Sequence, residues 1–394
     1  MSGRTAPRRV SHSQRRGPTS GRERRQEQWR GRRDEAGMKN VEERLGHRDQ
    51  ESVPRGTCQS MCPIWELQER EAQNRLHRFE MLAGTERDRR PRADSLRAVK
   101  EYTRPAAGKD STRPSDLRPP AVLLKTVCYL VDEIVVSPSL QPWTDVYDFV
   151  FDRLRSVKQD MIIQRVSGPD CEVILERIVR FLIYSSVRLC GEPLRLYDPR
   201  INDTHLQECL SWLLNCYAAG SGPHPNQEDF QALGLLYNLG SPCAMQHTIK
   251  LPKRLRTSPS VSLALSINQA FLERNPVRLI RLARKLNFLQ SCALHQHLGV
   301  CRKDLLLIYS HGHSSRNCHF PLDRLAGLLS LDGSLTVQLC QAHGVEVNHK
   351  NQVVFSKTSF MEPEPRKLHC VLYHQIISEK QRNLSVGDII HGYA

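Results

Sequence analysis

The chain has 394 residues and a formal net charge of +15, with 39% hydrophobic and 25% charged residues. This length allows two or three domains with a buried core, and the composition excludes a collagen-like or wholly disordered chain. The most apolar stretch, residues 122–131, is interrupted by Lys125 and is about half as long as a membrane span. We therefore expect no membrane insertion and, since no apolar run follows the amino terminus, no signal peptide.

Residues 1–54 are predicted to be an arginine-rich arm without regular structure. Residues 1–33 contain 11 Arg, no Lys and two Glu, a net charge of +9. They hold too few large apolar side chains to offset the entropy cost of ordering. Such an arm suits binding of nucleic acid or an acidic protein, or nuclear import, and suits equally well a solvated terminus without a function.

Residues 55–119 are predicted to form a helix followed by a proline-rich connection. The helix is expected over 63–83, with Pro63 in its first turn and charges between the apolar positions. Five prolines fall within 84–120, where we expect an ordered connection with one short helix at 93–102.

Helical periodicity dominates residues 120–290, which we predict to be a stack of antiparallel helix pairs. Helices are expected over 120–135, 145–164, 170–190, 205–219 and 227–239, and further helices begin at Pro259 and Pro276. The expected N-caps are Thr144, Thr204 (in a capping box with Gln207), Asn226, Ser258 and Asn275.

Residues 291–394 are predicted to form a winged-helix-type C-terminal module. Helices are predicted to start at Pro321 and Ser334, and two short strands are predicted at 345–347 and 353–355. Helix, turn, helix and hairpin is the order of a winged-helix module. The expected fold is mainly α: a helical stack that ends in a winged helix.

The 13 cysteines lack a repeating spacing, which favours free thiols in a reducing compartment. Cys58 and Cys62 are four residues apart, but no second pair completes a zinc site nearby. A second group could hold zinc, although solvated histidines and buried thiols are the favoured interpretation; it comprises His295, His297, Cys301, His311, His313, Cys318 and His319. We expect no metal and no cofactor.

The sequence contains no arrangement that predicts catalysis. Residues 107–111 resemble a phosphate-binding loop, but Thr103 replaces its first glycine and Asp110 replaces the Ser or Thr after the lysine. We therefore predict a protein that is not an enzyme and takes no small-molecule substrate.

A basic face is the strongest binding signal outside the arm. Five residues recur at three- and four-residue spacing on what we predict to be one helix face: Arg274, Arg278, Arg281, Arg284 and Lys285. Such a face can bind phosphates or an acidic protein, and an ordinary solvated helix face is the equally weighted alternative. The absence of interleaved aromatic residues argues against a platform for stacked single-stranded bases.

Four ordered blocks of sequence resemble those of the SAC/GANP family. They are residues 57–63 (TCQSMCP), 99–109 (VKEYTRPAAGK), 115–120 (SDLRPP) and 149–160 (FVFDRLRSVKQD). The resemblance implies a PCI-like helical stack closed by a winged helix, which agrees with the periodicity. It also implies a small acidic DSS-type protein as partner; RNA, bound through the basic faces, is the alternative partner.

The family resemblance also implies a cellular role. The chain lacks the Phe-Gly repeats and the long C-terminal extension of long members, and it is most similar to the short animal SAC-domain-containing branch, which is linked to centrosome duplication and mitotic progression. The expected location is the cytoplasm, centrosome and spindle, with messenger-RNA export in the nucleus as the alternative.

The motif residues are expected to be structural. Arg118 and Pro119 would fix the entry to the first long helix, Gly108 would allow a tight connection, and the charged residues of 152–160 would form ion pairs along and between helices. The complete set is Cys58, Met61, Cys62, Pro63, Arg104, Pro105, Gly108, Lys109, Asp116, Arg118, Pro119, Asp152, Arg153, Arg155 and Asp160.

Overall fold

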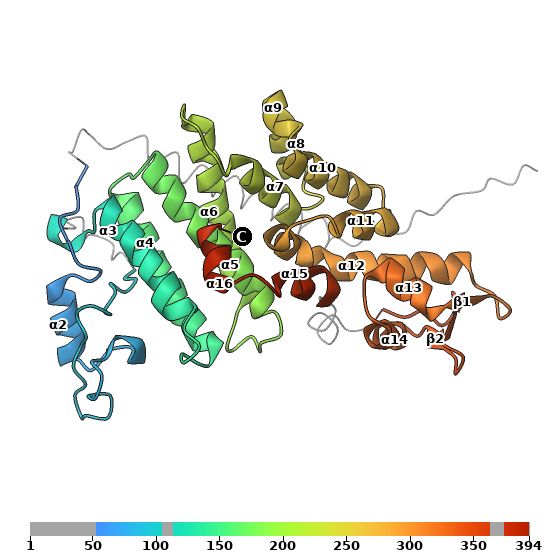
Figure 1. The fold of residues 1–394 in the computed structure, drawn as a ribbon, viewed down its shortest axis with the longest axis horizontal. Coiled ribbons are helices and arrows are strands. Elements are labelled where there is room, and N and C mark those ends of the chain that lie inside the picture. The colour runs from blue at the N-terminus through green and yellow to red at the C-terminus, as the bar shows by residue number, and fades with distance from the viewer. Residues whose placement is uncertain (1–52, 105–112, 363–373, 394) are drawn as a thin grey trace, which may run out of the picture. The chain divides into compact units, whose positions relative to one another are not determined.

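Helices make up most of the computed structural model, as the periodicity predicted (Figure 1). The structure describes residues 53–104, 113–362 and 374–393. The helices and strands given below belong to one unit, Pro54–Ala394. The predicted arm of residues 1–54 lies almost wholly outside the described residues, as do Pro105, Gly108 and Lys109. Within the described ranges, no helix has the length and apolarity needed to cross a membrane.

The helical stack begins with α3 (Pro120–Tyr129), which continues into the π-helical turn η3 (Leu130–Val135). It continues through α4 (Trp143–Ile163), α5 (Pro169–Arg188), α6 (Pro199–Ala219), α7 (Gln227–Tyr237), α8 (Pro242–Lys250), α9 (Lys253–Arg256), α10 (Pro259–Leu272), α11 (Pro276–Ala283) and α12 (Phe288–Gly312). Helices α3, α5, α6, α8, α10 and α11 each have a proline in the first turn, where its missing N–H costs no hydrogen bond.

The predicted order of the winged-helix elements is confirmed, but the prediction omitted one strand. After α12 come β1 (His319–Pro321), α13 (Leu322–Leu329), α14 (Gly333–Ala342), β2 (Glu346–Val347) and β3 (Gln352–Val354). The sheet order is β1-β3-β2, with both pairings antiparallel. The three-residue strand β1 is too short to show a period, so it was missed.

Several predicted boundaries were wrong. The helix expected over 63–83 is α2 (Ile64–Ala72), followed by a 3₁₀ turn, η1 (Arg78–Glu80). Asn74, with φ of 55°, turns the chain out of the helix. Residues 93–102 contain no helix: Arg97 and Ala98 donate to the carbonyl of Asp94 in a single turn, and Lys100 N–H donates to Met61 O (3.0 Å).

The N-caps were predicted with mixed success. Asn275 accepts from the backbone of Arg278, as expected. Thr144 and Thr204 lie inside helices, because α4 begins at Trp143 and α6 at Pro199; the Thr204 hydroxyl donates to the carbonyl of Arg200. Asn226 and Ser258 precede their helices without a side-chain cap bond.

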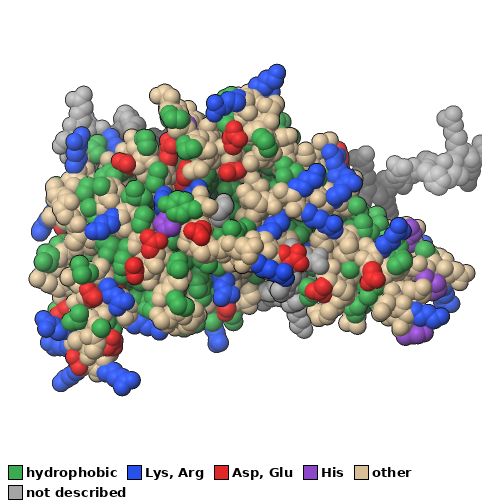
Figure 2. All heavy atoms as spheres, in the orientation of Figure 1, with side chains coloured by type: hydrophobic (Ala, Val, Ile, Leu, Met, Phe, Trp, Pro, Cys, Tyr) green, Lys and Arg blue, Asp and Glu red, His purple; other side chains and the backbone are tan. Residues whose placement is uncertain are grey.

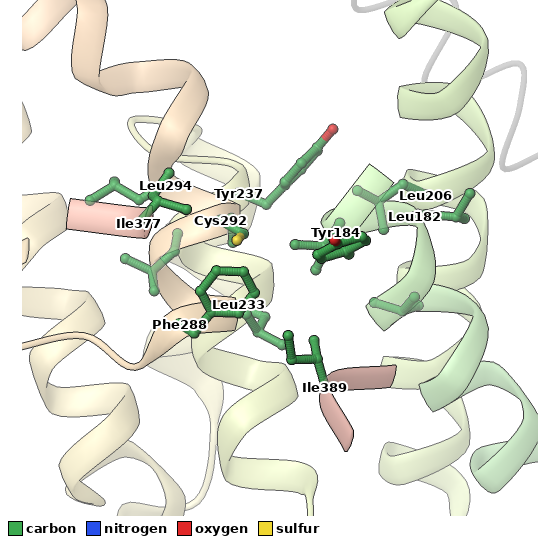
Figure 3. Close-up of a cluster of buried hydrophobic side chains, with 14 of the residues drawn as sticks. Leu182, Tyr184, Leu206, Leu233, Tyr237, Phe288, Cys292, Leu294, Ile377 and Ile389 are labelled. Carbon is green, nitrogen blue, oxygen red and sulfur yellow. The ribbon is translucent and has the colours of Figure 1, made fainter. Parts of the chain in front are cut away.

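The last described segment returns to the stack rather than staying with the winged helix. It comprises η4 (His374–Ser378), α15 (Glu379–Gln381) and α16 (Val386–His391), and α16 packs against α5 and η3. Figure 3 shows Ile377 and Ile389 in a cluster with Leu182 of α5, Leu233 of α7 and Phe288 of α12. We call residues 374–393 the C-terminal strap. Sequence analysis had assigned it to the winged-helix module.

One lysine of the C-terminal strap ties it to the end of α11. The Lys380 ammonium donates to the carbonyls of Ala283 (3.1 Å) and Leu286 (2.6 Å) and to the hydroxyl of Ser291 (2.8 Å). A cation at these carbonyls satisfies groups that the helix leaves unpaired and interacts favourably with the helix dipole. The strap therefore stabilises the junction between α11 and α12.

Candidate functional site

The first motif segment packs against the start of the helical stack. Backbone bonds join Thr57 to Pro114 (2.8 Å) and Cys58 to Leu117 (3.0 Å). Gly56 approaches the backbone of Leu117 so closely that a Cβ atom would lie 2.5 Å from its carbonyl oxygen, so a glycine is required here. Gly56 also donates its backbone N–H to the side chain of Gln164 (2.8 Å), the C-cap residue of α4, so the segment is held at the end of α4.

Glu80 is the centre of a first buried ionic cluster. One carboxylate oxygen accepts from Arg70 (2.7 Å) and from Arg153 of α4 (3.1 Å), and the other accepts from the backbone N–H of Val99 (2.9 Å). Arg70 also donates to the carbonyl of Val99 (3.0 Å) and to the sulfur of Cys62 (3.2 Å). Both Arg70 and Glu80 are fully buried.

Asp160 of α4 is the centre of a second buried ionic cluster. Its two carboxylate oxygens accept from Arg118 Nε (2.8 Å) and Lys100 Nζ (2.7 Å). Arg118 also donates to the hydroxyl of Ser156 (2.9 Å) and to the carbonyl of Met61 (3.2 Å). Asp160 and Arg118 are fully buried, and together the two clusters join all described motif blocks to α4.

Other motif residues surround these clusters. Asp152 pairs with Arg153 (2.5 Å) and accepts from the backbone of Tyr102 (3.2 Å). Arg155 makes no ion pair among the described residues; its guanidinium lies 3.8 Å from the ring centroid of Tyr102, a cation–π contact. The ion pairs of 152–160 therefore mainly connect α4 to other segments.

Four motif residues at the edge have simpler surroundings. Asp116 accepts from the indole of the half-exposed Trp65 (2.7 Å). Pro119 is the N-cap residue of α3, and Pro63 precedes α2. Arg104 is exposed at the end of a described range.

The motif cysteines act as buried thiols. Cys58 lies 3.3 Å from the carbonyl of Ser60, and burial raises the pKa of Cys62 to about 12. Among the described residues, no group of three or more potential ligands could hold a metal ion. In the second candidate group, His295, His297 and His311 each lie within hydrogen-bond distance of backbone carbonyls.

Cys62 is expected to resist alkylation in the folded protein, because its high pKa leaves almost no thiolate at pH 8. Treatment with iodoacetamide followed by peptide mass mapping should leave Cys62 unmodified and label the exposed Cys243. In urea both should be labelled. Equal labelling in the native protein would contradict the buried position.

The predicted basic residues do not share one helix face, because α11 covers only Pro276–Ala283. Arg274 lies before α11, and Arg284 and Lys285 follow it. Arg284 donates to the hydroxyl of Ser330 (2.7 Å) and to the carbonyl of Gly327, so it anchors α13. Arg278 pairs with Glu273 (3.0 Å).

Three basic residues remain available for a ligand: Arg274, Arg281 and Lys285, which are exposed and whose side chains make no ion pair with another described residue. Lys and Arg side chains gather over α11 in Figure 2. We call these three residues the α11 basic patch.

Sequence reasoning did not single out Glu80, although its carboxylate joins two arginines. A charged residue directly after the buried Phe79 was the available signal, and it is weak because exposed glutamates occupy similar positions in many helices.

The protein is a helical stack that ends in a winged helix. Its charged motif residues form two buried ionic clusters, which identifies the motifs as the structural signature of a class of helical proteins. The chain belongs to the SAC3/GANP family, whose model matches residues 61–349. The resemblance of the four blocks is thereby confirmed.

Three relatives show the extent of the likeness. The chain is 28% identical to SAC3 family protein 1 of Schizosaccharomyces pombe over 86% of its own length and 35% of that protein. It is 28% identical to Protein xmas of Drosophila melanogaster (86% of this chain, 16% of that protein) and 25% identical to SAC3 family protein B of Arabidopsis thaliana (76% and 18%). The chain thus matches about a third or less of the length of each relative.

Proposed function

We propose that this protein is a non-enzymatic scaffold in centrosome duplication and mitotic progression, and that it binds a small acidic protein of the DSS type. Family membership supports a scaffold role connected with messenger-RNA export or mitosis. The proposed role in the centrosome rests on the resemblance to the animal SAC-domain-containing branch of the family. The proposed location is the cytoplasm, centrosome and spindle.

One observation carries the proposed partner: the segregation of charge along the chain. Residues 230–303 contain eleven Lys or Arg and one Glu, a net charge of +10. Outside this segment and the arm of residues 1–33, the net charge is −4. The segment covers α8 to α11 and most of α7 and α12, so a basic surface suits an acidic protein by charge complementarity.

Tagging and depletion in cycling cells test the cellular role. The tagged protein is expected at centrosomes and the spindle, and its depletion is expected to change the number of centrosomes per cell. A signal confined to nuclear pores, with normal centrosome counts after depletion, would overturn the proposed role.

Charge reversal of the α11 basic patch tests the partner. The variant Arg274→Glu, Arg281→Glu, Lys285→Glu is expected to lose copurification with an acidic DSS-type protein, whereas Arg87→Glu, Arg89→Glu, Arg90→Glu should retain it. The control changes the charge equally at exposed residues of another segment. Arg284 is left intact because it anchors α13. Equal retention by both variants would contradict the placement.

An RNA adaptor in nuclear messenger-RNA export is the second candidate function, and the same basic segment favours it. Phosphate contacts would make the affinity for oligouridine fall steeply with salt, by a slope of about −0.7 per neutralised phosphate in single strands. A slope near zero would exclude this function.

A further inference from the structure

A second binding feature of the basic segment is an apolar groove between α8 and α10. The groove has a volume of about 480 Å³ and is lined by Pro242, Met245 and Ile249 of α8 and by Leu272 of α10, among others. Ile249 is 49% exposed and Leu272 57% exposed. Neighbouring half-exposed aliphatic side chains at a hollow are a feature of protein interaction sites.

The groove is built on a fixed base. Asn268 is fully buried, accepts from the backbone N–H of Gly240 (2.8 Å) and donates to the sulfur of Met245 (3.4 Å). Gly240 has φ of 79°, and a Cβ atom there would lie 2.6 Å from the ring of Phe271. The two helices are therefore held at a close turn, so the groove exists before a partner binds.

Basic residues line this groove and follow it closely in the sequence. Lys250 lines it, and Lys253 and Arg254 follow within four residues on α9. No acidic residue occurs between Asp229 and Glu273. Glu273 is paired with Arg278 (3.0 Å), and Asp229 accepts from the hydroxyl of Ser260 (2.7 Å). Lys and Arg side chains are visible around α9 in Figure 2.

We propose that the α8–α10 groove docks an acidic segment of a partner protein, which inserts a bulky apolar side chain between Met245, Ile249 and Leu272. Its carboxylates face Lys250, Lys253 and Arg254. This docking site rests on the proposed function, which gives the scaffold an acidic partner, and adds that the partner needs an apolar anchor as well as negative charge.

Charge and the aliphatic lining argue against three other occupants of the groove: residues 1–33 of this chain, a second copy of the chain, and RNA. The chain's own residues 1–33, with a net charge of +9, would be repelled by this segment, and a second copy would bring the same basic surface. RNA supplies negative charge, but its bases stack on aromatic side chains, and the groove lining is aliphatic.

Two synthetic acidic peptides of equal charge test the proposal, one with two leucines among aspartates and glutamates and the other with serines in their place. Fluorescence anisotropy with the full chain should show about tenfold tighter binding of the leucine peptide, equivalent to about 1.4 kcal/mol. Ile249→Ser with Leu272→Ser should remove this difference. Lys250→Glu, Lys253→Glu, Arg254→Glu should weaken both peptides at least about tenfold and reduce the salt dependence.

A matched control changes similar residues elsewhere. Leu194→Ser with Arg195→Glu alters an exposed leucine and arginine in the α5–α6 connection, and should change peptide affinity less than about twofold. Because Ile249 and Leu272 are about half exposed, their substitution should leave the urea unfolding midpoint near that of the unchanged protein. This measurement verifies that lost binding is not lost folding.

Other results would contradict the proposal that the groove is a docking site, and these results can be distinguished from a failure of the proposed function. Equal affinity for the two peptides, or an unchanged preference in the Ile249 and Leu272 variant, removes the apolar anchor. If charge reversal of the α11 basic patch abolishes binding while the groove variants bind normally, the acidic partner stands and the groove does not. If neither peptide binds and oligouridine does, both the groove and the acidic partner fall in favour of RNA.

Discussion

Asp160→Ala is expected to lower the free energy of unfolding by about 3–5 kcal/mol, the loss typical when one partner of a buried ion pair is removed. The substitution leaves the Arg118 guanidinium buried without its carboxylate, and it also removes the partner of Lys100. Urea unfolding followed by circular dichroism measures this loss.

Another aspartate of α4 supplies the control. Asp145 pairs with Arg78 at 2.9 Å, but the side chains are 44% and 48% exposed. Since water screens exposed pairs, Asp145→Ala is expected to cost less than about 1 kcal/mol. Equal costs at the two positions would contradict the view that α4 organises the motif blocks through buried charge.

A double variant separates the contribution of the ion pair to stability from the contribution of side-chain packing. Arg118→Met with Asp160→Leu removes both charges and retains much of the apolar volume, so it is expected to be more stable than either single variant. Strictly additive losses would show that the two side chains do not act as a pair.

Ile389→Ala in the C-terminal strap is expected to cost about 2–4 kcal/mol, because it leaves a cavity in the core. The side chain is 3% exposed and lies in the cluster with Leu182 and Phe288 (Figure 3). Ile377→Ala is expected to cost a similar amount, since this side chain is 2% exposed in the same cluster. Thermal and urea unfolding of the full chain measure both losses.

The exposed end of the strap provides the control for these two substitutions. Tyr393 is 76% exposed, and Tyr393→Ala is expected to change the free energy of unfolding by less than about 1 kcal/mol. A strap that only rests on the surface would make all three substitutions equally mild, and that result would remove its structural role.

Periodicity predicted the helices whose apolar residues recur at helical spacing with charged residues between them. The residues of α5 at 174, 178, 181 and 182 repeat at helical spacing and are all buried, so their helix was predicted within two residues at each end. The winged-helix helices α13 and α14 were found for the same reason.

The same reasoning failed for α12, which has buried residues on several sides. Leu294, Leu298, Cys301 and Leu305 form one row, but Cys292, Arg302 and Leu306 are also buried because both the stack and the winged helix cover the helix. A helix with apolar residues on several sides has no continuous polar stripe to reveal its period. The predicted domain boundary between residues 290 and 291 therefore falls within the first turn of α12.

The structural role of the motif residues was predicted, but the residues with which they pair were not. Spacing indicated that Asp160 and Arg153 would form ion pairs, and they do. Their partners Arg118 and Glu80 lie 42 and 73 residues earlier in the chain. Such pairs depend on the tertiary fold, and nothing in local spacing identifies them.

The continuity of α12 has a consequence for how the protein would meet its partners. Its 25 residues extend over about 38 Å at 1.5 Å per residue. Its first half packs on the stack, and in its second half Arg302 donates to the carbonyl of Leu329 at the end of α13 (3.0 Å). A single helix that belongs to both parts leaves no hinge between them. A partner that touches the stack and the winged helix together would find both surfaces already in place, so the scaffold would lose little conformational entropy and the partner would bear the cost of ordering.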